Sequence, residues 1–108
     1  MLTHADVREI ALSLPEAYEA PHFESTSFRV GKKIFCTAGE NGAGIILKLL
    51  PEDQHNLSEG DPEHIRPVEG YWGRSGWTQV TFAGMDRAPL LNLVRMAWAG
   101  VAPKRLLR

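Results

Sequence analysis

The segment Gly70–Phe82 reads Gly-Tyr-Trp-Gly-Arg-Ser-Gly-Trp-Thr-Gln-Val-Thr-Phe and joins a glycine-rich turn to a β-strand. From Trp77 onward the side chains alternate between two faces, as they do in a half-buried strand. Residues 73–76 (Gly-Arg-Ser-Gly) can adopt the positive φ angles of a tight reversal, because glycine has no Cβ. A loop that carries a cation between aromatic residues is either a binding surface or the ordinary end of a hairpin. Thr78, Val80 and Phe82 lie on one face of this strand, and Trp77, Gln79 and Thr81 lie on the other.

Length and composition indicate one globular domain covering residues 1–108. A chain of this size buries roughly two-thirds of the surface that it exposes when unfolded. Hydrophobic residues make up 44% and charged residues 23% of the sequence, which is typical of a folded rather than a disordered protein. No apolar run approaches the ~20 residues of a membrane helix, and the first residues lack the pattern of a secretory signal. Because Cys36 is the only cysteine, no internal disulfide can form, and we expect a cytoplasmic protein without a membrane partner.

The net charge of −1 conceals a segregation of charge along the chain. Acidic residues dominate segments 1–27 and 51–69, whereas Lys and Arg dominate segments 28–48 and 70–108. The basic segments include most of the predicted strands and the C-terminus, so they could form one basic face. The pI of 6.4 is nevertheless below that of most dedicated nucleic-acid-binding proteins.

The first part of the chain predicts a helix followed by two paired strands. The helix spans Thr3 to Leu14, with Thr3 as its N-cap, and Pro15 ends it because the residue before a proline avoids the helical region. Residues 16–24 are expected to form a polar connector without regular structure. The two strands are Ser25–Val30 and Lys33–Ala38, and Gly31-Lys32 joins them as a two-residue turn.

The later elements complete the prediction of an α+β fold. After a turn at residues 39–42 come a strand over 44–50, a helix over 51–58, a weak strand over 65–68 and the strand over 77–82. A last helix begins after Asp86 and ends near Gly100, and a further turn is expected over 102–107. The order is α-β(3)-α-β(2)-α. Strands so close in sequence form an antiparallel sheet, so we predict a two-layer fold with helices packed on the sheet.

Short motifs are distributed along nearly the whole chain. They are Ser13-Leu14-Pro15-Glu16, Pro21-His22-Phe23, Phe28-Arg29-Val30-Gly31-Lys32-Lys33-Ile34-Phe35, Leu47-Lys48-Leu49-Leu50-Pro51-Glu52, Gly73-Arg74-Ser75-Gly76-Trp77 and Ala97-Trp98 with Val101-Ala102-Pro103-Lys104-Arg105-Leu106. In this order they resemble the MmcQ/YjbR-like family. The resemblance implies a compact α+β domain similar to the CyaY-like and secretion-chaperone-like folds. It also implies a "double wing", in which two antiparallel β units form a proposed DNA-binding surface.

Cations at the predicted turns are the candidate nucleic-acid-binding residues. Lys32 and Lys33 lie at one predicted hairpin tip and Arg74 at another, and binding of phosphates requires cations spread over a surface. Trp72 or Trp77 could stack on a base. The alternative is that hairpin tips carry Lys and Arg to remain soluble and to discourage pairing of strand edges. The candidates are Arg29, Lys32, Lys33, Lys48, Trp72, Arg74, Lys104 and Arg105.

The tryptophans and the cysteine are first of all candidate core residues. Trp77 begins a strand and Trp98 lies on a helical stripe, so both are predicted to fill the core. Trp72 lies among glycines and is the tryptophan expected to be exposed. Cys36 alternates with apolar residues in a strand, which predicts a buried, inert thiol.

His22, between a proline and a phenylalanine, is the candidate pocket residue. The four histidines show none of the spacings of a metal site, so we predict no metal and no cofactor. A small-molecule pocket formed by His22, Tyr18 and Trp77 is a third interpretation that depends only on the types of residue present.

Our leading hypothesis is a non-enzymatic module that binds nucleic acid, in particular DNA, through basic β-hairpin wings. The alternative is a protein-interaction or dimerisation module that uses an exposed sheet edge and an apolar patch around Tyr71 and Trp72. The placement of the cations discriminates between them. Convergence of Lys32, Lys33, Lys48, Arg74 and Lys104 on one face would favour DNA.

Overall fold

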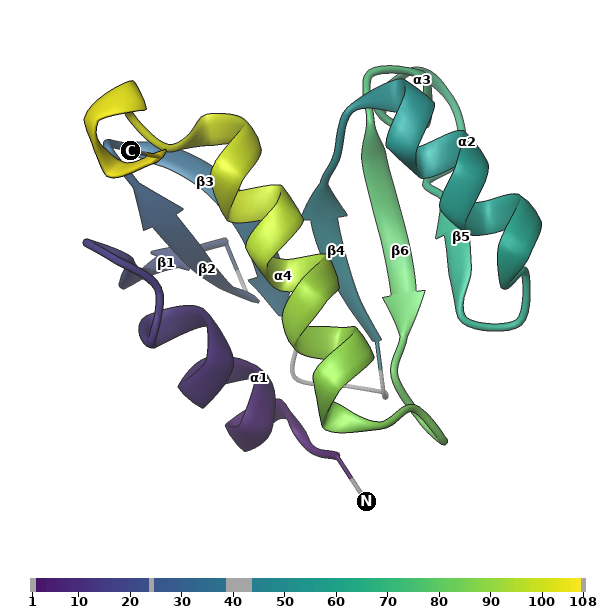
Figure 1. The fold of residues 1–108 in the computed structure, drawn as a ribbon, viewed down its shortest axis with the longest axis horizontal. Coiled ribbons are helices and arrows are strands. Elements are labelled where there is room, and N and C mark those ends of the chain that lie inside the picture. The colour runs from purple at the N-terminus through teal and green to yellow at the C-terminus, as the bar shows by residue number, and fades with distance from the viewer. Residues whose placement is uncertain (1, 24, 39–43, 108) are drawn as a thin grey trace.

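The computed structural model describes residues 2–23, 25–38 and 44–107, and within these residues six strands form one sheet. Helices pack against the sheet, so the predicted α+β class is confirmed (Figure 1). In chain order the elements are α1 (His4–Leu12), β1 (Tyr18–His22), β2 (Ser25–Val30), β3 (Lys33–Ala38), β4 (Gly44–Lys48), α2 (Pro51–Gly60), β5 (Ile65–Pro67), α3 (Tyr71–Arg74), β6 (Trp77–Thr81), α4 (Arg87–Val101) and the 3-10 turn η1 (Lys104–Leu107).

The sheet is antiparallel throughout, with the strand order β1-β2-β3-β4-β6-β5. Its first four strands follow one another, and β6 then pairs with β4 over the whole length of both strands, from Gly44 opposite Thr81 to Lys48 opposite Trp77. β5 adds to the far side of β6. The two β units predicted from the sequence are therefore parts of one continuous sheet.

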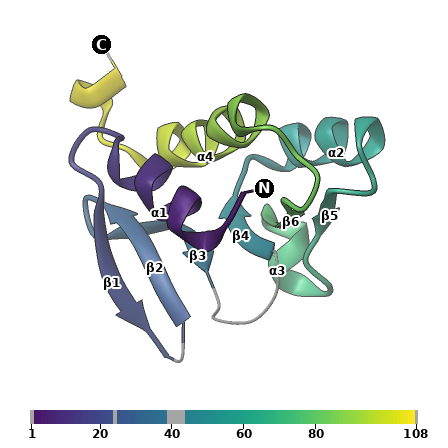
Figure 2. The ribbon, with the colours of Figure 1, turned by 90° about the horizontal axis from the view of Figure 1, so that it is seen from below.

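The long helices cover one face of this sheet. Figures 1 and 2 show α1, α4 and α2 in a layer on that face, whereas α3 lies on the opposite side beside β6. Alternate residues of the central strands point into the helix layer, among them Ile45 and Leu47 of β4 and Val80 of β6, which are fully buried. The α4 residues that meet them are Leu90, Leu93, Val94, Ala97 and Trp98.

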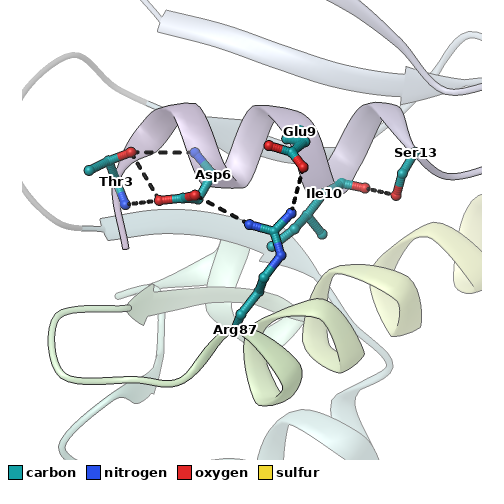
Figure 3. Close-up of polar contacts among 6 residues, drawn as sticks. All are labelled: Thr3, Asp6, Glu9, Ile10, Ser13 and Arg87. Atoms are coloured by element: carbon teal, nitrogen blue, oxygen red, sulfur yellow. Dashed lines mark hydrogen bonds and ion pairs between the residues drawn. The ribbon is translucent and has the colours of Figure 1, made fainter. Parts of the chain in front are cut away.

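Polar contacts hold α1 in place against α4 (Figure 3). Thr3 and Asp6 form a capping box at the start of α1, in which each residue's side chain binds the backbone of the other. The hydrogen bond from the Thr3 backbone lowers the pKa of Asp6 and favours its charged form. Arg87, the first residue of α4, then reaches Asp6 at 3.2 Å and Glu9 at 3.0 Å. The first turn of α4 thus contacts the first turn of α1.

The structure also corrects the predicted order of elements. Residues 16–24 were expected to be a connector, but Tyr18–His22 pairs with β2 along its whole length. Its sequence contains Pro21 and no β-branched residue, so strand propensity alone does not predict a strand here. The proline is tolerated because β1 lies at the edge of the sheet. The predicted reversal at 73–76 overlaps the end of the short helix α3, and α4 continues through Gly100 to Val101. The predicted turn at 39–42 lies outside the described residues.

Other predicted elements are confirmed with close to the expected boundaries. Ser25–Val30 and Lys33–Ala38 are strands, and Gly31 and Lys32 between them have φ angles of 58° and 73°. Both angles are positive, as a type I′ hairpin turn requires. Among the described residues, no helix has the length and apolar character needed to cross a bilayer.

His64 is expected to make stability depend on pH. Its ring bonds Asp61 at 2.9 Å on one side and the carbonyl oxygen of Ala83 at 3.1 Å on the other, which ties α2 and β5 to the end of β6. The hydrogen bond that the ring donates to Asp61 raises the pKa of His64 above its ordinary value near 6.5. The folded state therefore holds the proton more tightly than the unfolded state. The resulting stabilisation is complete below about pH 6.5 and is lost as the pH rises through the raised pKa.

Urea denaturation between about pH 6 and pH 9 measures this loss as a fall in the free energy of unfolding. Asp61→Asn removes the carboxylate and should flatten the profile over this range. An unchanged pH profile in Asp61→Asn would contradict the assignment to this pair.

Candidate binding face on the sheet

The face of the sheet opposite the helix layer carries apolar side chains that the helices do not cover. Ile34 of β3 pairs with Arg29, and Ile46 of β4 lies opposite Gln79 and Thr37. The residues beside Ile46 in the chain are buried under the helices, so Ile46 itself points away from them. β4 therefore has apolar side chains on both faces of the sheet. The helices cover only one face, so the apolar side chain on the other face has no layer of helices over it.

These side chains line a hollow of about 410 Å³ on the helix-free face. His22 of β1 borders it on one side and Trp72 of α3 on the other, while β3, β4 and β6 form its floor. Figure 2 shows the hairpin β1–β2 and the helix α3 extending from the sheet away from α2 and α4, on either side of these strands. The lining residues are His22, Ile34, Thr37, Ile46, Val68, Trp72 and Trp77. We call this hollow the trough.

The trough brings together residues that the sequence analysis treated separately. His22, the candidate pocket residue, shares the trough with Trp72 and Trp77. Trp77 is half-buried on the open face, so the prediction that it fills the core beneath the helices is wrong. Trp98 does lie in the core, where its indole N–H donates to the carbonyl oxygen of Pro15 at 3.1 Å. Tyr18 lies on β1 outside the lining residues.

Tight backbone packing positions α3, which forms one wall of the trough. A Cβ atom on Gly73 would overlap the carbonyl oxygen of Val68, so only glycine allows this approach. Gly76 has a φ angle of 109°, and a Cβ atom there would overlap the carbonyl oxygen of Leu49. Gly73 and Gly76 are thus needed for the close packing around α3 as well as for a turn.

A buried glutamine of α2 fixes the same wall from the helix side. The Nε2 amide of Gln54 lies 2.9 Å from the carbonyl oxygen of Gly73, 3.0 Å from that of Trp77 and 3.0 Å from Oγ1 of Thr78. The Thr78 hydroxyl in turn donates to the carbonyl oxygen of Gly76. The carbonyl oxygens of Gly73 and Trp77 also accept backbone N–H groups, so the Gln54 amide adds a second hydrogen bond to each and links α2 to α3.

Aromatic side chains beside the trough are exposed. Trp72 is 61% exposed and Tyr71 is 68% exposed, and their rings meet edge to face. Phe23, at the tip of the β1–β2 hairpin, is 95% exposed and has a φ angle of 56°, which is rare for a bulky side chain. Its ring contacts that of His22 at a centroid distance of 4.8 Å. Exposed aromatics on both sides of a hollow are typical of a surface that contacts a partner.

The candidate cations lie at one end of the sheet but not all on one face of it, because Lys33 lies opposite buried Val30 on the helix side and Lys48 lies opposite Trp77 on the open side. β3 begins at Lys33 and its neighbour β4 ends at Lys48, and antiparallel pairing places these two termini at the same end. Lys48 also donates to the backbone carbonyl of Ser75, the residue after Arg74. The C-terminal segment reaches this end too, since a Cβ atom on Gly31 would lie 3.5 Å from Pro103. We call this end, with Lys32, Lys33, Lys48, Arg74 and Lys104, the basic end.

Lys48 and Arg29 border the trough itself. The Lys48 ammonium lies 5.7 Å from the centroid of the Trp77 ring and therefore stands at the edge of the trough. Arg29, directly opposite Ile34, is held along the β1–β2 hairpin by the hydroxyl of Ser27 at 2.9 Å and the carbonyl oxygen of Pro21 at 3.3 Å. These partners are uncharged, so the guanidinium remains a net positive charge beside the open face.

Two candidate cations differ from the prediction. Arg74 is the last residue of α3 and not a residue at a hairpin tip. Arg105 forms two bonds of 2.6 Å with the Glu16 carboxylate. The bond from Arg105 lowers the pKa of Glu16, so this pair stays charged and neutralises itself. Arg105 is consequently less available for a phosphate than the lysines near it.

Cys36 lies on the opposite side of the sheet, within the core. It is fully buried, so its predicted burial is confirmed, and burial raises the pKa of its thiol. The apolar residues Ile34, Ile46 and Val68 were not predicted as site residues. The signal that could have revealed them is the nearly continuous apolar run of β4, because a sheet with helices on one face needs apolar residues on that face alone.

Comparison with known proteins identifies the family. The family model named YjbR matches residues 12–99, which is most of the chain. The chain belongs to the YjbR family. No curated protein matches it.

A solved structure shows the same fold as this YjbR chain. The crystal structure of Deinococcus radiodurans protein DR2400, which carries the family-model domain DUF419, is 25% identical in sequence and superposes with a TM-score of 0.81. The match covers 94% of the present chain and 79% of the Deinococcus protein. The similarity therefore extends over nearly the whole of the present chain.

Gly73→Ala is expected to destabilise the protein and to disturb α3. The added methyl group overlaps a backbone oxygen that cannot move freely, so we expect a loss of about 3 kcal/mol in the free energy of unfolding. Gly100→Ala is the matched control, because Gly100 lies in the last turn of α4 and its added Cβ atom would meet no neighbouring atom. That variant should gain up to about 1 kcal/mol. Urea denaturation compares the two, and equal stability of both variants would contradict the close approach of α3.

Proposed function

We propose that this YjbR protein is a non-enzymatic module that binds nucleic acid, with DNA as the expected ligand. The observation that carries the proposal is the convergence of Lys32, Lys33, Lys48 and Arg74 at one end of the sheet. Lysine side chains spread over such an end can each contact a phosphate, and together they supply affinity without reading sequence.

The acidic residues near the basic end belong mainly to the helix layer. Glu52 and Asp53 stand in the first turn of α2, which lies on the side of the sheet opposite α3. Glu16 is occupied by Arg105. A phosphate chain that runs along this end of the sheet therefore meets Lys48 and Arg74 on the open side and Lys33 on the helix side, where it lies opposite buried Val30. Exposed Glu69, just before α3, is an acidic residue beside them. This arrangement supports a positively charged surface on a protein with a net charge of only −1.

The expectation of a non-enzymatic role is supported by the chemistry of the open face. The trough is lined almost entirely by apolar side chains, with His22 and Thr37 as its polar groups. The thiol of Cys36 is enclosed in the core. Apolar and aromatic groups bind and orient a partner, whereas acid–base catalysis needs paired polar groups within hydrogen-bond reach.

Reversal of charge at the basic end should abolish binding to DNA. Wild-type protein is expected to bind a short fluorescent DNA with a dissociation constant of about 1 to 100 µM, and the affinity should fall steeply as salt rises. The triple variant Lys32→Glu/Lys33→Glu/Arg74→Glu should lose binding at low salt. Fluorescence anisotropy in a salt series measures both effects.

Arg95→Glu is the control for the change in charge. Arg95 is an exposed residue of α4, so its reversal alters net charge on the opposite layer of the fold. We expect its affinity for DNA to stay within about twofold of the wild type, since it contacts no phosphate. Equal loss of binding in Arg95→Glu and in the single variant Lys33→Glu, or no binding by the wild type to single or double strands, would overturn the proposal.

A second candidate function is association with a protein or with another copy of the chain. The exposure of Phe23, Tyr71 and Trp72 around the trough favours it, because aromatic anchors dominate many protein interfaces. Sedimentation equilibrium over a range of protein concentrations tests self-association directly. A dimer that is lost in Trp72→Ala would establish this function, and a monomer throughout would exclude it for a second copy.

A further inference from the structure

The trough has the form of a site for one flat, largely apolar ring. Its described lining includes two tryptophans and two isoleucines, and it includes no carboxylate. Thr37 and His22 are its hydrogen-bonding groups, and they come from neighbouring parts of the sheet. A space of about 410 Å³ accommodates a heterocycle with part of its substituents.

Positive charge borders this apolar surface at two positions. Lys48 stands beside Trp77 at the end of β4, and Arg29 is the cross-strand neighbour of Ile34. A ligand that fits both features carries a ring next to an anionic group. No unmodified amino-acid side chain combines an aromatic ring with an anionic group, whereas every nucleotide has a base beside a phosphate.

We propose that the trough holds an unstacked base of single-stranded nucleic acid, with Trp72 as the ring on which the base stacks. The adjacent phosphates lie toward Lys48 and Arg29. This inference rests on the proposed nucleic-acid binding and adds the form of the ligand. In a duplex the bases are stacked on one another and paired, so their faces cannot reach Trp72 without opening of the helix.

Trp72 is well placed for this role because its position is fixed while its side chain is accessible. Gly73, the next residue, packs against Val68, and its carbonyl oxygen accepts a bond from Gln54. A rigid aromatic side chain loses little conformational entropy when a base stacks on it. Stacking on aromatic side chains tolerates any base, so we expect little sequence preference.

The test compares single-stranded and double-stranded ligands for the same variants. The probes are a fluorescein-labelled oligothymidine of about 10 nucleotides, in the range of single-strand site sizes, and its duplex with the complementary strand. We expect the wild type to bind the single strand roughly tenfold more tightly than the duplex. Trp72→Ala should weaken single-strand binding by about tenfold, as the loss of one stacked base predicts, and leave duplex binding unchanged.

Matched variants separate stacking from a general effect on α3. Trp72→Phe retains a ring and should recover most of the single-strand affinity. Tyr71→Ala removes the neighbouring exposed ring, which does not line the trough, and should change the affinity by less than about twofold. Circular dichroism confirms that each variant is folded.

The outcomes distinguish this inference from the function on which it rests. Equal binding of single strand and duplex, with no effect of Trp72→Ala, would overturn the trough as a base site and leave binding at the basic end intact. Absence of binding to either probe would overturn both. A concentration-dependent dimer that Trp72→Ala dissociates would assign the trough to a second copy of the chain and would also overturn the base site.

Discussion

The antiparallel pairing of β4 with β6 is the contact on which the candidate face depends. It joins the strands β1 to β4 to the later strands, so one sheet forms where the sequence indicates two β units. The same register places Lys48 directly opposite Trp77, which brings a cation from one half of the chain to the edge of an aromatic ring from the other. Without this pairing, neither the floor of the trough nor the basic end would be continuous.

The two faces of the sheet are covered to different extents. On one face, α1, α4 and α2 supply the apolar layer that the alternating residues of the central strands require, and this layer contains the core. On the other face, α3 covers only one end, and it is held there by Gly73, Gly76 and the amide of Gln54. The apolar side chains left between α3 and the β1–β2 hairpin have no partner in the described chain. Binding can make use of that uncovered surface.

Much of the architecture follows from local sequence. The hairpin between β2 and β3 was predicted with the observed boundaries, because glycine at residue 31 allows a turn with positive φ and both flanking strands contain β-branched or aromatic residues. The first strand was missed because its sequence has no strand propensity, and pairing with β2 overrides that local preference. The short helix α3 was missed because glycines at 73 and 76 predict a turn, whereas here they permit close contact with neighbouring backbone.

For the candidate site, the sequence by itself determined which residues carry charge, which tryptophan is most exposed and that Cys36 is buried. It also identified His22 as a pocket residue. Only the tertiary structure decided that His22, Trp72 and Trp77 line one trough and that Arg105 is neutralised by Glu16. The physical reason is that alternation within a strand specifies two faces but not which of them the helices cover. That choice is made by the packing of elements distant in sequence, and it turned Trp77 from an expected core residue into part of an open binding face.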